Sequence, residues 1–189
     1  MADLRLPPRE FLRECFDYDP ETGLFRWRRR PERHFADEGV ALGWNNRMAG
    51  RPAFVSPDGR GYLMAEVAYD GHRWRPRAHV VAFKLMTGAE PEMVDHRDLN
   101  IQHNWFTNLR PTDKMGNRHN SPGWRRHPLP KGVSFDRGKF RAAGHYKGRK
   151  FELGSYSTAA EAHAAYCAWA RPLHGEFFNA GPEKSSVFD

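Results

Sequence analysis

The stretch from Val94 to Asn117 most constrains what this chain can fold into. It begins next to an apolar pair and continues into a loop whose residues are too polar for a hydrophobic core. The apolar pair Met93-Val94 leads into Asp95 and His96, and the residues after this pair are mostly polar. This pattern predicts a strand, a long loop, a second short strand and then a helix. Such an order can bring Asp95, His96 and Asn117 together around one metal ion.

The side chains in this stretch suit hydrolysis of a phosphodiester. A hard divalent cation held by oxygen ligands stabilises the leaving oxygen and the charge that develops at phosphorus. Asp95 and Asn117 carry such oxygens, and we predict that they bind Mg²⁺ or Mn²⁺. We predict His96 as the base that takes a proton from water, because imidazole titrates near neutral pH. Asn108 is expected to hydrogen-bond either the loop backbone or the imidazole and so to order the site.

The same stretch resembles a known family. The matching residues are Asp95-His96, Asn104, Asn108-Leu109-Arg110, Thr112 and Asn117. They resemble the ββα-metal motif of HNH endonucleases, in particular the homing enzymes of phages and introns. The segment from Ala78 to Gly88 is similar to the helix that precedes the motif there. Val80 stands where the family usually has Arg, and Leu99 where it usually has Gly, so the details of the loop are expected to differ.

The overall charge of the chain points to a polyanionic partner. The net charge is +7 over 189 residues, which favours binding to nucleic acid. No apolar run approaches the about 20 residues of a membrane span, and no signal-peptide core is present. The two cysteines, Cys15 and Cys167, stand alone, which favours a reducing compartment. We therefore expect no membrane partner and, with the family resemblance, a cytoplasmic location in a bacterial or phage-infected cell.

Positive charge gathers between Thr112 and Lys150. That segment holds eleven Lys or Arg and two Asp, a net charge of +9 that exceeds the charge of the whole chain. Arg125 and Arg126 fall within residues 121–130, which are rich in Pro, Arg and His and are predicted to form a basic linker. These two arginines are predicted DNA contacts.

The chain after the linker predicts a small α+β unit. Alternating segments divided by Gly138 and Gly148 predict three strands, and Thr158 with Glu161 predicts a capping box that begins a helix. The helix would cover one face of the sheet and leave the other free for DNA. The predicted DNA contacts are the basic residues of the strands and turns: Arg137, Lys139, Arg141, Lys147, Arg149 and Lys150.

This unit also resembles a known domain. The matching segments are Gly132-Val133, Gly138-Lys139-Phe140, Leu153 to Ala162 and Leu173 to Phe177. They are similar to the ethylene-response-factor (APETALA-type) DNA-binding domain, whose bacterial and phage relatives often follow an HNH nuclease. The plant members carry arginines where this chain has Ser134 and Asp136, so their base preference does not carry over.

Three further arginines are candidates for DNA contact. Arg73, Arg75 and Arg77 follow a predicted hairpin turn at Asp70-Gly71 and share one strand face by the period of two. A contact with the DNA backbone and a merely soluble face are both open, because Glu66 lies nearby.

The predicted fold class is α+β, with a ββα-metal nuclease domain followed by a three-stranded sheet and one helix. The predicted segments are an N-terminal lead-in (1–51), an HNH nuclease domain (52–120), a basic linker (121–130), a three-stranded DNA-binding domain (131–180) and a tail (181–189). Within the lead-in, residues 31–51 show no usable period and are predicted as loop.

Together the residues and the resemblances predict a metal-dependent HNH homing endonuclease that its C-terminal domain targets to double-stranded DNA. Two alternatives stay open. A non-catalytic, sequence-specific DNA-binding protein or transcriptional regulator would keep the HNH scaffold for its shape. An RNA-binding module fits the charge but leaves Asp95, His96 and Asn117 unexplained. The oligomeric state also stays open, with a monomer favoured.

Overall fold

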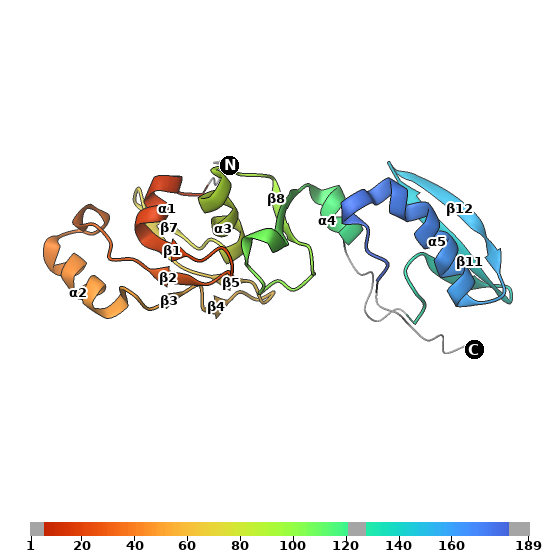
Figure 1. The fold of residues 1–189 in the computed structure, drawn as a ribbon, viewed down its shortest axis with the longest axis horizontal. Coiled ribbons are helices and arrows are strands. Elements are labelled where there is room, and N and C mark those ends of the chain that lie inside the picture. The colour runs from red at the N-terminus through yellow and green to blue at the C-terminus, as the bar shows by residue number, and fades with distance from the viewer. Residues whose placement is uncertain (1–5, 121–127, 182–189) are drawn as a thin grey trace. The chain divides into compact units, whose positions relative to one another are not determined.

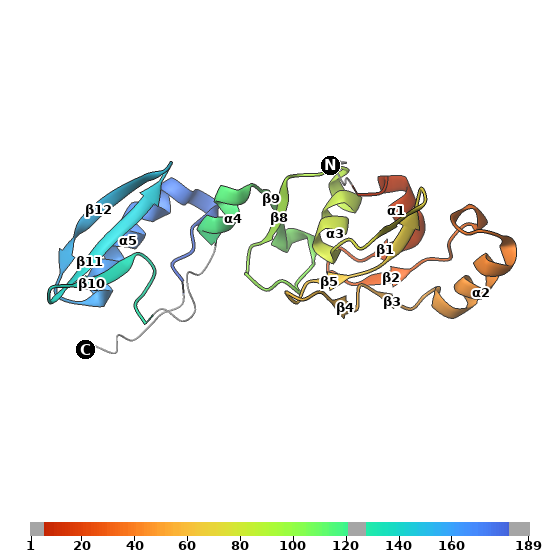
Figure 2. The same ribbon diagram turned by 180° about the vertical axis from the view of Figure 1, so that it is seen from behind.

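A computed structural model describes residues 6–120 and 128–181 of the chain. The chain divides into two compact units, Met1–Asp113 and Lys114–Asp189. Each unit combines helices with short antiparallel strands (Figure 1; Figure 2 from behind). The predicted α+β class is therefore confirmed.

The first unit contains three α-helices, two short 3-10 helices and nine short strands among its described residues. The helices are α1 (Arg9–Cys15), η1 (Glu32–His34), α2 (Glu38–Met48), α3 (Ala78–Thr87) and η2 (Phe106–Asn108). One sheet has the order β1 (Phe16–Tyr18), β2 (Phe25–Trp27) and β3 (Pro52–Ala53). Three two-stranded ribbons follow: β4 (Ser56–Pro57) with β5 (Leu63–Met64), β6 (Val67–Tyr69) with β7 (His72–Trp74), and β8 (Met93–His96) with β9 (Leu109–Thr112).

A single hydrophobic core joins the predicted lead-in to the strands of the predicted nuclease region. Leu12 of α1 and Val81 of α3 are fully buried, and Phe25 of β2 and Val94 of β8 belong to the same cluster. Burying side chains of this size stabilises the fold by about 1.5–3 kcal/mol each. Residues 6–51 therefore fold as part of the unit that carries β8 and β9.

Residues 31–51 contain a helix, so the prediction of a loop was wrong. The helix α2 begins at an N-cap, where the Asp37 carboxylate accepts a hydrogen bond of 2.8 Å from the Val40 backbone N–H. Only Ala41 and Asn45 of this helix are buried, so it carries no apolar stripe for periodicity to detect. Its sequence signal is the cap.

The second unit has one sheet and one long helix. Its elements are α4 (Lys114–Asn120), β10 (Val133–Asp136), β11 (Lys139–Tyr146), β12 (Arg149–Tyr156), α5 (Ala159–His174) and η3 (Gly175–Phe177). The strands form an antiparallel sheet in the order β10-β11-β12, and α5 lies along one of its faces (Figure 1). Thr158 and Glu161 form the predicted capping box. The predicted three strands and helix are thus confirmed.

The side of this sheet that faces α5 is packed closely. Phe140 and Ala142 of β11 are buried with Ala162 of α5. A Cβ atom at Gly144 would lie 2.0 Å from the Trp169 ring, so only glycine fits there. By alternation, residues 139, 141, 143 and 145 of β11 lie on the other face of the sheet.

Candidate active site

The antiparallel pair β8–β9 fixes the two central residues of the predicted site. Asp95 and His96 are the last residues of β8, and they lie opposite Arg110 and Leu109 of β9. Both side chains are buried. The helix α4 begins at Lys114, directly after β9. The expected order of strand, loop, strand and helix is therefore present along the chain.

Asp95 forms a buried ion pair with Arg110. The Oδ2 atom of Asp95 accepts hydrogen bonds from Nε and Nη2 of Arg110 at 3.0 and 2.9 Å. Such a pair needs good geometry to offset the cost of removing both charges from water. The guanidinium therefore holds the carboxylate in one orientation. The sequence analysis assigned no role to Arg110. Knowledge of the strand register would have placed Arg110 opposite Asp95.

His96 is held by an amide whose orientation is set. The Nε2 atom of His96 lies 3.2 Å from Oδ1 of Asn104, while Nδ2 of Asn104 donates to the Gln102 carbonyl at 3.0 Å. Because the amide presents its oxygen to the ring, Nε2 must carry the proton, and Nδ1 holds the lone pair. Burial lowers the pKa of His96, so the ring is neutral at neutral pH, as a base requires.

The N-terminal segment supports this histidine through Asn104. The hydroxyl of Tyr18 donates a hydrogen bond of 2.7 Å to the Asn104 carbonyl. A Cβ atom at Gly23 would lie 2.4 Å from the backbone of Asn104 and Trp105, so the turn and the loop pack backbone to backbone. Sequence reasoning missed both residues, because only tertiary packing brings them to the loop.

Asn108 orders the loop by hydrogen bonds to the loop backbone, the first of the two partners predicted for it. Its Nδ2 atom donates to Oδ1 of Asp98 at 2.9 Å and to the His103 carbonyl at 2.8 Å. Its Oδ1 atom accepts from the Asp98 backbone N–H at 3.1 Å. Asp98 also pairs with Nδ1 of His103 at 2.6 Å. Asn108 therefore joins both ends of the loop between β8 and β9.

Leu99 takes a strained conformation in this loop. Its φ angle is +66°, in the left-handed region where a side chain on Cβ is disfavoured and glycine is not. The residue is 37% exposed, so its packing compensates for the strain only in part. Leu99, which stands where the resembled family usually has Gly, therefore occupies a position where the backbone favours glycine.

His79 packs against the candidate base. Its ring centroid lies 4.9 Å from that of His96 and 5.1 Å from that of Tyr62. Burial, with smaller contributions from His96 and Arg77, lowers the pKa of His79 to about 3. Tyr62 and His96 also form a ring pair, at 6.3 Å, so the three rings cluster together. The buried histidine next to His96 is uncharged at neutral pH.

The metal ligands predicted from sequence lie in different units. Asp95 belongs to the first unit, and Asn117 lies exposed on α4 in the second. Among the described residues, no group of three or more His, Cys, Asp or Glu side chains could hold a metal ion. Mg²⁺ often takes only one or two protein carboxylates and completes its shell with phosphate and water. The joint binding of a metal by Asp95 and Asn117 stays a prediction.

The hairpin predicted at Asp70-Gly71 is present, but its arginines do not share one strand. The turn joins β6 to β7 with positive φ angles of 51° and 70° at its two residues, as a two-residue hairpin requires. The strand β7 ends at Trp74, before Arg75 and Arg77. The predicted strand face therefore contains Arg73 but neither Arg75 nor Arg77.

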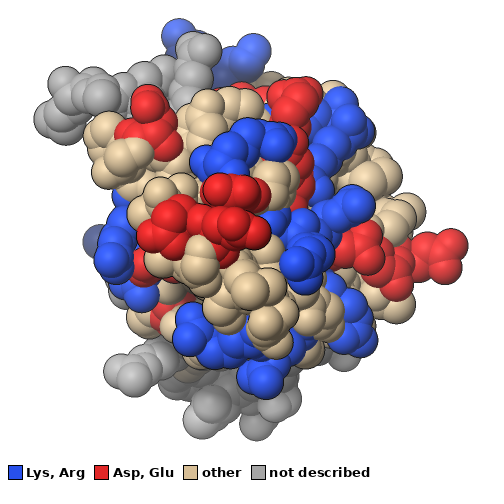
Figure 3. Space-filling view, turned by 90° about the vertical axis from the view of Figure 1, so that its left-hand side faces the viewer, with Lys and Arg blue, Asp and Glu red and all other residues tan. Residues whose placement is uncertain are grey.

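Acidic residues offset the charge of all three arginines. Arg73 and Arg75 lie 3.2 and 3.4 Å from the Glu66 carboxylate, and Arg77 lies 2.6 Å from Oδ2 of Asp58. The face of the first unit in Figure 3 likewise mixes Lys and Arg with Asp and Glu. DNA contact by these arginines stays a prediction.

The basic residues predicted in the second unit divide into three groups. Lys139 and Arg141 lie on the free face of the sheet, and Lys150, opposite His145 in the register, joins them there. Arg149 alternates with Lys150 and so lies on the side of α5. The other two, Arg137 and Lys147, occupy tight turns with φ angles of 49° and 47°.

Ion pairs also reduce the charge of the free face. Arg141 pairs with Asp136 at 2.8 Å, and Lys150 pairs with Glu152. The net surplus of positive charge is therefore smaller on this face than the sequence count suggests. Arg125 and Arg126, the last predicted contacts, lie outside the described residues.

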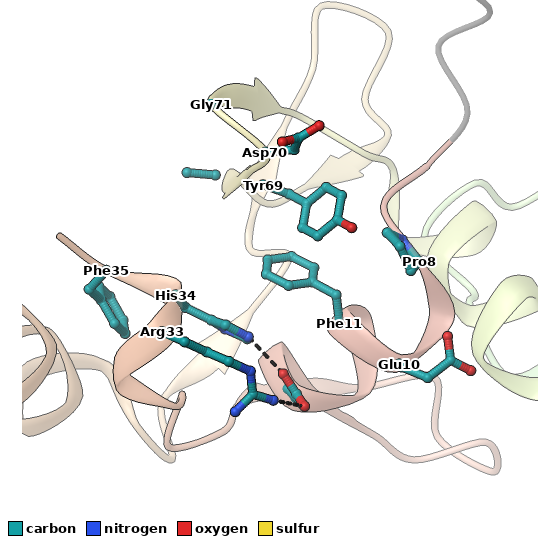
Figure 4. A pocket seen from close by; sticks show the side chains of 11 residues that line it. Pro8, Glu10, Phe11, Arg33, His34, Phe35, Tyr69, Asp70 and Gly71 are labelled. Carbon is teal, nitrogen blue, oxygen red and sulfur yellow. Dashed lines mark hydrogen bonds and ion pairs between the residues drawn. The ribbon is translucent and has the colours of Figure 1, made fainter.

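A separate pocket of about 510 Å³ lies on the first unit, and none of its lining residues is a predicted site residue (Figure 4). The rings of Phe11 and Tyr69 form one wall, with centroids 4.7 Å apart. Glu14 pairs with Nε2 of His34 at 2.7 Å and with Arg33. Glu10 and Asp70 also line the pocket, so its wall holds three carboxylates beside Arg33 and His34.

Comparison of the chain with protein-family models, with curated proteins and with solved structures found no match. In the part of the chain that the structure describes, no helix is long and apolar enough to span a membrane. Function is therefore inferred from the residues of the chain itself.

Replacement of Leu99 by glycine should stabilise the first unit. Leu99→Gly relieves a left-handed strain of about 1–2 kcal/mol and adds about 0.5–1 kcal/mol of backbone entropy cost. We expect the free energy of unfolding to rise by about 0.5 kcal/mol, measured by urea denaturation. Leu99→Val, the control, should lower it, because a β-branched residue tolerates this φ worst. Equal stability of the three proteins would contradict the strained geometry.

The stability of the protein should fall as the solution is acidified below pH 6.5. The folded pKa of His79, about 3, lies below its ordinary value of 6.5, so between these values the unfolded chain binds a proton that the folded chain does not. Each pH unit in that window costs about 1.4 kcal/mol. His79→Phe should reduce the loss of thermal stability between pH 7 and pH 5. An unchanged pH slope in the variant would show that His79 is not the buried neutral group.

Proposed function

We propose that the protein is a metal-dependent DNA endonuclease of the HNH homing type. The observation that carries this proposal is the buried His96, whose Nε2 atom faces the side-chain oxygen of Asn104 at 3.2 Å. It lies beside Asp95, a carboxylate that Arg110 holds in one orientation. An oriented carboxylate next to a neutral imidazole favours a role in phosphodiester hydrolysis over a purely structural role for these two residues.

Each residue has a defined role in this reaction. His96 accepts a proton from the attacking water at Nδ1, the nitrogen that carries the lone pair. Asp95 and Asn117 would provide oxygen ligands for Mg²⁺ or Mn²⁺, and a bound metal would stabilise the charge that develops on the phosphate and the leaving oxygen. Asn108 and Asn104 keep the loop and the ring in place, and His79 excludes water from one face of the imidazole.

Double-stranded DNA is the proposed substrate, and the second unit is proposed to recruit it. Lys139, Arg141 and Lys150 lie on a sheet face that α5 leaves uncovered. A narrow antiparallel sheet fits the major groove, where Lys and Arg reach both phosphates and guanine edges. Recruitment by a second unit raises the local concentration of DNA at the first.

Cleavage should depend on His96 and on a divalent metal. The assay is supercoiled plasmid carrying the DNA that flanks the protein's own gene, incubated with Mg²⁺, with Mn²⁺ and with EDTA. We expect metal-dependent conversion to open-circular or linear DNA. Loss of a general base costs about 10²–10⁴-fold in rate, so His96→Ala should cut at least a hundredfold more slowly while binding DNA as well as the wild type.

A matched histidine provides the control for this assay. His72 is exposed in the β6–β7 hairpin, where its ring bonds the backbone of its own turn, so His72→Ala should cut at the wild-type rate. Equal cleavage by His96→Ala and the wild type would overturn the proposed role of His96. Tight binding without any cut product would instead favour a non-catalytic DNA-binding protein.

A further inference from the structure

The second unit contains a pocket of about 410 Å³ at an open edge of its sheet. The strand β10 pairs with β11 only as far as Val133 opposite Ala142, and the Gly132 carbonyl accepts one further hydrogen bond from Ala143 N–H at 2.9 Å. Beyond that point β10 no longer covers the edge of β11. The backbone from Gly144 to Tyr146 therefore lines the pocket.

The pocket wall is strongly basic. Arg118 of α4, Lys131 before β10 and Lys147 of the β11–β12 turn all line it, together with His145 and His174. None of the described residues in its wall is Asp or Glu. Three cations from three separate elements thus converge on one concave surface, a distribution that concentrates positive potential.

Lys131 is the most constrained of these cations. Its Nζ atom donates to the Asn179 carbonyl at 3.0 Å, which fixes the end of the side chain. Burial lowers the pKa of Lys131, because the ammonium has lost part of its hydration. An anion bound beside it would replace that hydration with a direct opposite charge.

The rest of the wall is shaped by close packing. A Cβ atom at Gly132 would lie 2.2 Å from the Tyr166 ring, so the chain can pass there only as glycine. The Nζ atom of Lys147 lies 5.4 Å from the centroid of the Tyr146 ring, a cation–π contact that steadies it at the rim. The cations therefore surround a space whose walls are rigid backbone and aromatic rings.

We propose that this pocket binds a phosphate group, with Arg118, Lys131 and Lys147 as its ligands. Phosphate matches the wall because it is a compact anion with several acceptor oxygens for Lys and Arg. The volume leaves room for the group that carries the phosphate. That carrier is either the backbone of DNA or a small phosphorylated molecule. This binding rests neither on nuclease activity nor on the free face of the sheet.

Titration of the full chain with potassium phosphate, followed by ¹H–¹⁵N NMR, tests the proposal. We expect saturable shifts at the amides of Gly144, Lys147 and Gly148, and no saturable shifts with potassium chloride at the same ionic strength. Arg118→Gln combined with Lys147→Gln should weaken phosphate affinity at least about tenfold, since two charge-assisted contacts are lost. The amide spectrum of the variant also reports whether it is folded.

The matched control removes one Arg and one Lys charge at the β10–β11 turn, outside the pocket. Arg137→Gln combined with Lys139→Gln should leave phosphate affinity unchanged, because neither residue lines the pocket. Wild-type affinity in the pocket variant, or an equal loss in the control, would overturn the proposal. So would shifts in chloride that match those in phosphate.

Addition of duplex DNA to the phosphate-bound protein distinguishes the two sources of the group. Displacement of phosphate from the pocket, seen as a return of the Gly144 and Gly148 amides to a phosphate-independent position, would assign the site to the DNA backbone. Simultaneous binding of both would assign it to a small phosphorylated ligand. Both outcomes keep the pocket as a phosphate site, and neither depends on whether the DNA is cut.

Discussion

The buried ion pair between Asp95 and Arg110 is the interaction on which the candidate site depends. It joins β8 to β9 in one register, since a shift of one residue would place Asp95 and Arg110 on opposite faces of the ribbon. Loss of either partner would leave the other charged and buried, which typically costs about 3–5 kcal/mol. With this register, His96 lies at the end of β8, directly before the loop that carries Asn104 and Asn108.

The loop itself is held from two directions. Asn108 and Asp98 close it from within, at the point where β9 begins. Tyr18 and Gly23, which lie far away in the sequence, pack against Asn104 from outside. The N-terminal segment therefore contributes to the placement of His96, although it contains none of the proposed reacting groups. Residues 6–51 also share a hydrophobic core with the rest of the first unit.

Local patterns in the sequence predicted local structure well. The capping box of Thr158 and Glu161, the hairpin at Asp70-Gly71 and the three strands of the second unit follow from short-range rules. The helix α2 was missed because its two buried residues make no apolar stripe, so only the Asp37 cap marks it.

Long-range contacts were harder to predict, for a physical reason. Tyr18 and Asn104 are 86 residues apart, and no local pattern in either segment indicates that they bond. Glu66 and Asp58 offset the charge of Arg73, Arg75 and Arg77, which a count of charges along the sequence does not reveal. The proposed catalytic residues could be named from sequence, but what orients them depends on the tertiary fold.

The most direct test of this account is the protonation state of His96, observed by long-range ¹H–¹⁵N NMR at pH 7 in protein labelled at histidine. We predict a neutral ring with its proton on Nε2. In Asn104→Ala, the proton should lose its preference for Nε2. A proton on Nδ1, or a doubly protonated ring, would contradict the proposal that His96 is poised to accept a proton at Nδ1.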